Sequence, residues 1–198
     1  MDKSLHTIHI FSEPLEFFRH LVTTAIGNQK VEVTQDLEYY LVSLLTKYME
    51  IEKMQRSAQS PLAIQFQKAL ISGPHERIQI LKELGDFSLY ISGFFSDSLN
   101  RKLVDIDYYM AMGGVAYHKL SDTVQTTSVL QTIFRDLALR FGTFVDILAE
   151  VSDSAFVHTH RDVLRLYEKW LKTKSERLAE LLKKEGLFPM DALTTTLT

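Results

Sequence analysis

Residues 81–95 read L-K-E-L-G-D-F-S-L-Y-I-S-G-F-F, and this stretch decides the fold. Apolar side chains recur at helical spacing on nearly every side of it, and Asp86 is its only charge after Glu83. A helix that is apolar all round is buried among other elements. We therefore predict a central helix at about residues 74–100, enclosed by other helices.

Residues 107–120, D-Y-Y-M-A-M-G-G-V-A-Y-H-K-L, have the same character and predict a second central helix at about 105–120. Both stretches contain glycine, which costs about 1 kcal/mol against alanine inside a helix. Close approach of two backbones explains such glycines. We expect the two helices to lie side by side, with Gly93 against Gly113 and Gly114.

Helix-start and helix-stop residues divide the rest of the chain. They predict five further helices, at about residues 12–26, 34–54, 61–72, 126–151 and 159–185. The fold class is therefore all-α, with one bundle of about seven helices in a single domain over residues 1–198. The ends, at about 1–11 and 187–198, are expected to be flexible.

The composition excludes several classes of function. The chain has 198 residues, 45% of them hydrophobic, a formal net charge of −3 and no cysteine. No basic field is present to attract nucleic acid, and thiol catalysis and disulfides are excluded. The first residues lack the apolar core of a signal peptide, and every uncharged run is too short to span a bilayer. We expect a cytoplasmic protein without a membrane span or a nucleic-acid partner.

Asp86 and Tyr90 lie one turn apart on the most apolar helix, so their polar ends share a face. A buried carboxylate is costly unless it is paired or hydrogen-bonded. Asp86 is therefore expected either to cap a neighbouring helix or accept a hydrogen bond from a buried tyrosine, or to act as a general base or ligand group in an internal pocket.

The second central helix carries further pocket candidates, namely Asp107, Tyr109 and His118. Aspartate at a helix start commonly satisfies free backbone N–H groups, and aromatic residues at this spacing commonly fill a core. The alternative is a pocket between the two central helices, lined by these residues with Asp86 and Tyr90, that holds a heme, a metal or a small apolar molecule.

The sequence lacks the motifs of common catalytic and metal sites. It has no paired Glu-x-x-His spacing, no phosphate-binding glycine loop and no nucleophile elbow. Glu16 and His20 share a helix face, and Glu150 precedes His158 and His160, but neither pattern is a strong metal spacing. No metal site, catalytic residue or cofactor is predicted, which favours a non-enzymatic function.

Two resemblances concern the central stretches. The run L-G-D-F-S-L-Y-I-S-G-F-F-S-D-S-L, followed by V-D-I-D-Y-Y-M-A-M-G-G-V-A-Y, resembles an uncharacterised family of bacterial all-helical proteins, which implies a bacterial source and carries over no catalytic residue. Leu84-Gly85-Asp86 with Ser92-Gly93 is similar to the glycine-bearing distal helix of heme oxygenases, although the Ser-Gly pair is displaced and a second adjacent glycine is missing. That resemblance implies His20 as the axial heme ligand.

The last predicted helix has a polar run, residues 172–177, before Leu178, Leu181 and Leu182. We expect these leucines to form a small apolar stripe for a protein partner or a second copy of the chain. The first functional hypothesis is therefore a non-enzymatic protein-interaction or self-association module, possible as a homodimer. The alternative is a helical protein, similar to heme oxygenases, that binds a heme, a metal or a small apolar ligand.

Overall fold

The computed structural model describes residues 14–54, 61–95, 106–124, 128–155 and 160–184, with side chains omitted at 50–54, 160–165 and 184. These residues form helices and no strand, which confirms the all-α class. Contacts divide the chain into two compact units, residues 1–151 and 152–198. A division by contacts does not test folding as one domain, so the single-domain prediction stays a prediction. The ends expected to be flexible lie outside the described residues.

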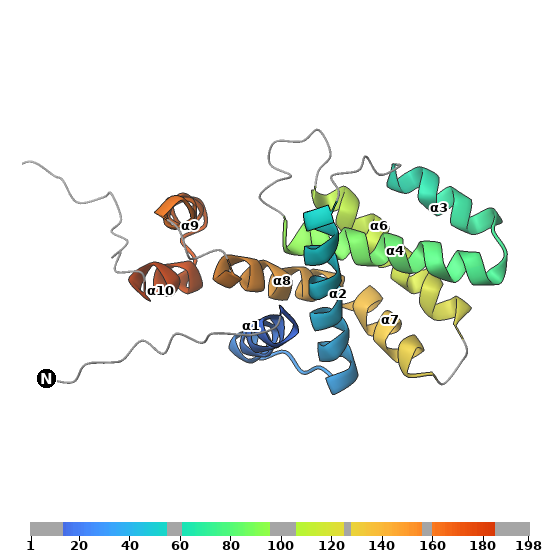
Figure 1. Cartoon of the computed structure of the whole chain (residues 1–198), viewed down its shortest axis with the longest axis horizontal. Helices are drawn as coiled ribbons and strands as arrows, with labels where there is room; N and C mark the ends of the chain where they lie inside the picture. Colours follow the sequence, from blue (N-terminus) through green and yellow to red (C-terminus); the bar gives the residue numbers. More distant parts are fainter. Residues whose placement is uncertain (1–13, 55–60, 96–105, 125–127, 156–159, 185–198) are drawn as a thin grey trace, which may run out of the picture. The chain divides into compact units, whose positions relative to one another are not determined.

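The first unit contains most of the helices (Figure 1). They are α1 (Pro14–Gln29), α2 (Gln35–Met54), α3 (Leu62–Ile71), α4 (Pro74–Gly93), α6 (Ile106–Thr123), α7 (Val129–Leu139) and α8 (Phe141–Ala155), whose last turn belongs to the second unit. The second unit continues with α9 (His160–Thr173) and α10 (Glu176–Lys184). The described part therefore holds nine helices, where the sequence predicted about seven.

Helices α4 and α6 share the most extensive contact of any two described helices, as expected for the central pair. Their glycines permit this contact, but in a different pairing from the predicted one. A Cβ at Gly85 would lie 2.7 Å from the Tyr117 ring of α6, and a Cβ at Gly113 would lie 2.7 Å from Ser88 Cβ of α4. Gly93 instead faces Leu148 of α8, so the prediction that it lies against Gly113 and Gly114 is wrong.

One break raises the helix count between α7 and α8. A single helix was predicted over residues 126–151, but Arg140 leaves the helical conformation, with φ −118° and ψ 32°. Its guanidinium forms an ion pair with Asp136 and donates to the carbonyl oxygen of Glu32, 3.0 Å away. Arg140 thereby ties this corner to the α1–α2 connection. The apolar repeat continues through the corner and conceals it in the sequence.

A second break separates α9 from α10. Lys174 has φ 52°, a left-handed conformation that ends the predicted long helix. Beyond it, α10 packs on α9, and Leu178 and Leu182 are buried with Leu166 and Trp170. The prediction of a free stripe of Leu178, Leu181 and Leu182 is wrong because Leu178 and Leu182 form this core, while Leu181 is partly buried against it.

Candidate functional site

Asp86 lies at the meeting point of three helices. Its side chain accepts hydrogen bonds from the Tyr40 hydroxyl of α2 and, at 2.9 Å, from the Tyr117 hydroxyl of α6, both on Oδ1. Lys82 Nζ, one turn earlier on α4, lies 2.6 Å from Oδ2 and 4.9 Å from the centre of the Tyr40 ring. Asp86 is 1% exposed. We call Tyr40, Lys82, Asp86 and Tyr117 the Asp86 cluster.

Electrostatics keep both tyrosines of the cluster protonated. Burial raises the pKa of Tyr40, and the charge of Asp86 and its hydrogen bond raise it further. Burial also raises the pKa of Tyr117 well above its ordinary value, with Asp86 and Tyr40 adding to the effect. The nearby Tyr48 has a raised pKa from burial and from the charges of Asp86 and Glu83. The hydroxyls of Tyr40 and Tyr117 therefore remain donors at neutral pH.

The chemical capacity of the cluster follows from its hydrogen bonds. A general base must reach the proton of a substrate directly or through one water molecule. Both oxygens of Asp86 already accept from donors of the chain itself, and the carboxylate is closed to solvent. This arrangement matches the interpretation that Asp86 accepts from a buried tyrosine. It suits a polar clamp that joins α2, α4 and α6.

The other predicted pocket residues do not join the cluster. Tyr90 is buried and stacks on Tyr48, with ring centroids 4.6 Å apart. Tyr109 is partly buried, contacts the rings of Phe87 and Tyr108, and has a pKa raised by burial. These two tyrosines thus belong to a group of contacting aromatic rings from α2, α4 and α6.

The remaining candidates are on the surface. Asp107 is exposed in the first turn of α6. His118 is exposed on the same helix, with its Nε2 3.9 Å from Asp122. His20, the heme-ligand candidate, is exposed on α1. Asp86 is therefore the only member of the predicted set that lies in the cluster, and its partners Tyr40, Lys82 and Tyr117 were not among the candidates.

Sequence reasoning missed Tyr40, Lys82 and Tyr117 as partners of Asp86. The four-residue spacing of Lys82 and Asp86 is the standard spacing of a helical ion pair and could have identified that contact. Tyr40 is one of the positions of the apolar stripe of α2, and Tyr117 lies among other aromatic residues of α6. Only the tertiary arrangement shows that their hydroxyls meet one carboxylate.

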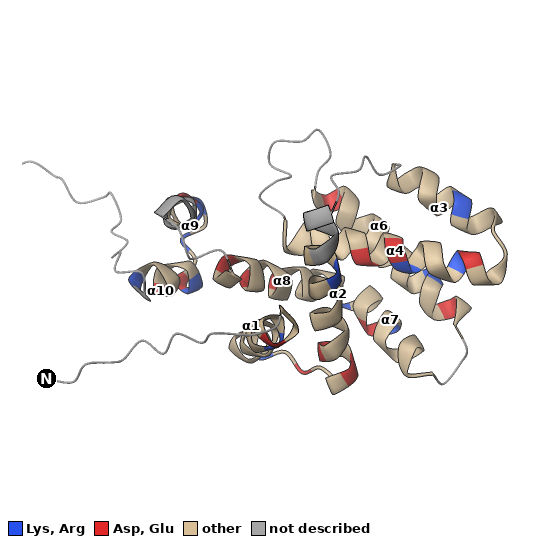
Figure 2. Cartoon of the chain, in the orientation of Figure 1, with Lys and Arg blue, Asp and Glu red and all other residues tan. Residues whose placement is uncertain are grey.

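An apolar face on α3 is a second feature of the first unit. Ile64, Leu70 and Ile71 are 56%, 50% and 83% exposed, while Leu62 and Ala69 are buried. Lys68 is the only charged residue of α3, as Figure 2 shows, and its Nζ lies 3.0 Å from Glu76 of α4. We call Ile64, Leu70 and Ile71 the α3 apolar face.

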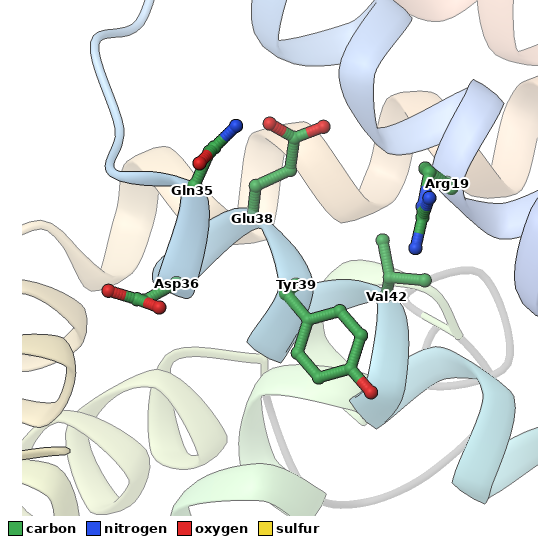
Figure 3. A pocket seen from close by; sticks show the side chains of 6 residues that line it. All are labelled: Arg19, Gln35, Asp36, Glu38, Tyr39 and Val42. Carbon is green, nitrogen blue, oxygen red and sulfur yellow. The ribbon is translucent and has the colours of Figure 1, made fainter. Parts of the chain in front are cut away.

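A pocket of about 360 Å³ opens between α1 and α2 (Figure 3). Its lining residues are Arg19 of α1 and Gln35, Asp36, Glu38, Tyr39 and Val42 of α2. None of these residues was a sequence candidate. The acidic residues Asp36 and Glu38 were a weak sequence signal for a pocket, because acidic residues are common in the first turn of a helix, where they stabilise the helix itself.

The described residues offer neither a metal-binding cluster nor a membrane-spanning helix. No group of three or more histidine, aspartate or glutamate side chains in those residues is arranged to hold a metal ion. No helix in the described ranges combines the length and the apolar character needed to cross a bilayer.

Comparisons of the chain with family models, with curated proteins and with solved structures gave no match. The resemblances to a bacterial all-helical family and to heme oxygenases therefore stay predictions, as does heme or metal binding.

Proposed function

We propose that the chain is a non-enzymatic helical module that self-associates through the α3 apolar face. The observation that carries this proposal is the exposure of Ile64, Leu70 and Ile71, each at least half exposed on one short helix. Large apolar side chains exposed together on one helix make that helix a candidate interaction site. The binding stripe expected near the end of the sequence has Leu178 and Leu182 buried and Leu181 partly buried.

The saturated Asp86 cluster supports a non-enzymatic function. The buried carboxylate of Asp86 accepts hydrogen bonds from Tyr40 and Tyr117 and forms an ion pair with Lys82. Such a clamp stabilises the scaffold on which α3 packs, because α4 carries Asp86 and also contacts α3.

A second copy of the chain is the partner that suits the α3 apolar face. Ile64 and Ile71 are seven residues apart, or two helical turns, and so lie on the same face. An antiparallel pair of α3 helices would place Ile64 of one copy opposite Ile71 of the other, which is the self-complementary contact of a two-fold dimer. Lys68 is already paired with Glu76, so no uncompensated charge on α3 opposes this contact.

The area of the α3 apolar face sets the expected affinity of the dimer. Stable interfaces bury about 800 Å² on each partner. Three half-exposed side chains supply less than that, so we expect a reversible dimer with a dissociation constant above about 10 µM.

Sedimentation velocity over a range of protein concentrations tests the proposal. The wild-type chain is expected to shift from monomer toward dimer as its concentration rises, and the Ile64→Ser/Ile71→Ser variant is expected to remain monomeric. Leu139→Ser is the matched control, because Leu139 is 73% exposed on α7. A wild-type monomer at every concentration, or a dimer unchanged in the double variant, would contradict the proposal.

A further inference from the structure

We infer that the pocket between α1 and α2 binds a small zwitterion, with its carboxylate on Arg19 and its ammonium group on Glu38. This inference is independent of self-association, because α3 contributes no residue to the pocket.

Charges of opposite sign line the pocket without neutralising one another. No carboxylate of the described residues forms an ion pair with the Arg19 guanidinium. Glu38 accepts a hydrogen bond from the Thr23 hydroxyl on Oε1, which holds its side chain beside α1. A ligand that carries both charges would pair with both groups, whereas a singly charged ligand would leave one of them unpaired.

The pocket also offers apolar surface. It comes from Tyr39, whose ring is more than half exposed, whereas Val42 lines the pocket wall but is only 1% exposed. In Figure 3, the Val42 side chain lies between those of Tyr39 and Arg19, and the Glu38 side chain extends upward from α2. An aliphatic side chain of the ligand can contact the Tyr39 ring while its charged end meets Arg19 and Glu38.

The size of the pocket limits the ligand class. A volume of about 360 Å³ is near the lower end of the range for small-molecule sites. It suits a free aliphatic α-amino acid or a very short peptide. Asp36 points away from Arg19 in Figure 3, so Glu38 is the carboxylate placed to bind the ammonium group.

Titration of the isotopically labelled full-length chain with L-leucine, followed by NMR, tests the inference. Leucinamide lacks the carboxylate and 4-methylpentanoate lacks the ammonium group, so the three probes separate the two charges. We expect L-leucine to shift resonances of Tyr39 and Val42 with a dissociation constant of about 1 mM, and both analogues to bind at least about ten-fold more weakly.

Substitutions identify the binding groups. Arg19→Gln and Glu38→Gln are each expected to weaken L-leucine binding about ten-fold or more, whereas Glu16→Gln, an exposed α1 position outside the pocket lining, should leave it unchanged. Circular dichroism of each variant confirms that it is folded. The inference is overturned if L-leucine causes no shifts, if either analogue binds as well as L-leucine, or if both pocket variants bind it like the wild type.

Discussion

At the scale of the residue, Asp86 is the polar group on which the central helices depend. Its carboxylate accepts from two tyrosine hydroxyls and pairs with Lys82 in a site closed to solvent. Removing one partner of a buried network leaves the others unsatisfied, which costs more than the net value of the network itself. The role of Asp86 is therefore to join α2, α4 and α6.

Asp86→Asn tests this role. The amide oxygen can still accept from both tyrosines, but the amide nitrogen would face the Lys82 ammonium group, which loses its counter-charge. We therefore expect the free energy of unfolding in urea to fall by roughly 1–3 kcal/mol. The exposed Asp122→Asn should change it by less than about 0.5 kcal/mol. Equal stability of the Asp86 variant and the wild type would show that the cluster is not a structural clamp.

Tyr117 makes the free energy of unfolding fall as the pH rises in the alkaline range. Its pKa is raised in the folded state, so both states hold the proton below the ordinary tyrosine value of about 10, and stability is complete there. Above pH 10 the unfolded chain loses the proton first, and stability falls by about 1.4 kcal/mol per pH unit for each such tyrosine.

Tyr117→Phe should make the decline of unfolding free energy above pH 10 shallower by about 1.4 kcal/mol per pH unit, measured by urea unfolding at several pH values. Tyr39→Phe, at a largely exposed position, is the control and should leave the slope unchanged. An identical slope in wild type and Tyr117→Phe would refute the raised pKa.

At the scale of the element, the contact between α4 and α6 rests on glycines that differ sharply in their surroundings. A Cβ at Gly113 would collide with Phe141 and lie 2.7 Å from Ser88 Cβ, whereas a Cβ at the adjacent Gly114 would meet no atom within 4 Å. Two neighbouring positions of one helix therefore offer a matched comparison.

Gly113→Ala should lower the free energy of unfolding by about 1–3 kcal/mol through overpacking. Gly114→Ala should raise it by up to about 1 kcal/mol, because alanine is the better helix former and nothing obstructs its side chain. Thermal or urea unfolding of both variants decides the question. Effects of the same sign and size would mean that α4 and α6 do not approach as closely as the structure shows.

The sequence predicted these elements to different degrees. The apolar stretches of α4 and α6 follow from local pattern, as does the start of the helix predicted at about residue 34, where the Thr34 hydroxyl accepts from the Leu37 N–H at 3.3 Å. The corners at Arg140 and Lys174 do not, because neither residue is a typical helix breaker. Arg140 is held by contacts with distant residues, and Lys174 by the packing of α10 on α9.

The same distinction applies to the candidate site. Burial of Asp86 followed from the apolar residues around it, but its tyrosine partners lie 46 and 31 residues away in the chain. A surface feature such as the α3 apolar face was equally hidden, since Ile64 and Ile71 look like core residues until the helix is placed.

At the scale of the whole molecule, the two compact units can be followed separately. Trp170 is the only tryptophan of the chain and is buried in the second unit against Leu178 and Leu182. Its fluorescence therefore reports on that unit, while hydrogen exchange of α4 and α6 reports on the first.

Leu182→Ala should destabilise the second unit by about 2–4 kcal/mol, because the removed side chain is completely buried. The urea midpoint of Trp170 fluorescence should fall, with little change in hydrogen exchange of α4 and α6. Leu171→Ala, at an exposed position of α9, is the control. An equal loss of protection in both units would instead indicate a single cooperative domain.

Self-association through α3 is the central claim, and disulfide trapping tests it most directly. The chain contains no cysteine, and the exposed Gln67 lies midway between Ile64 and Ile71, near the axis of the proposed antiparallel pair. Under mild oxidation, Gln67→Cys should form a covalent dimer much faster than Asp146→Cys, an exposed position on α8. Equal rates for the two variants would contradict an α3 interface.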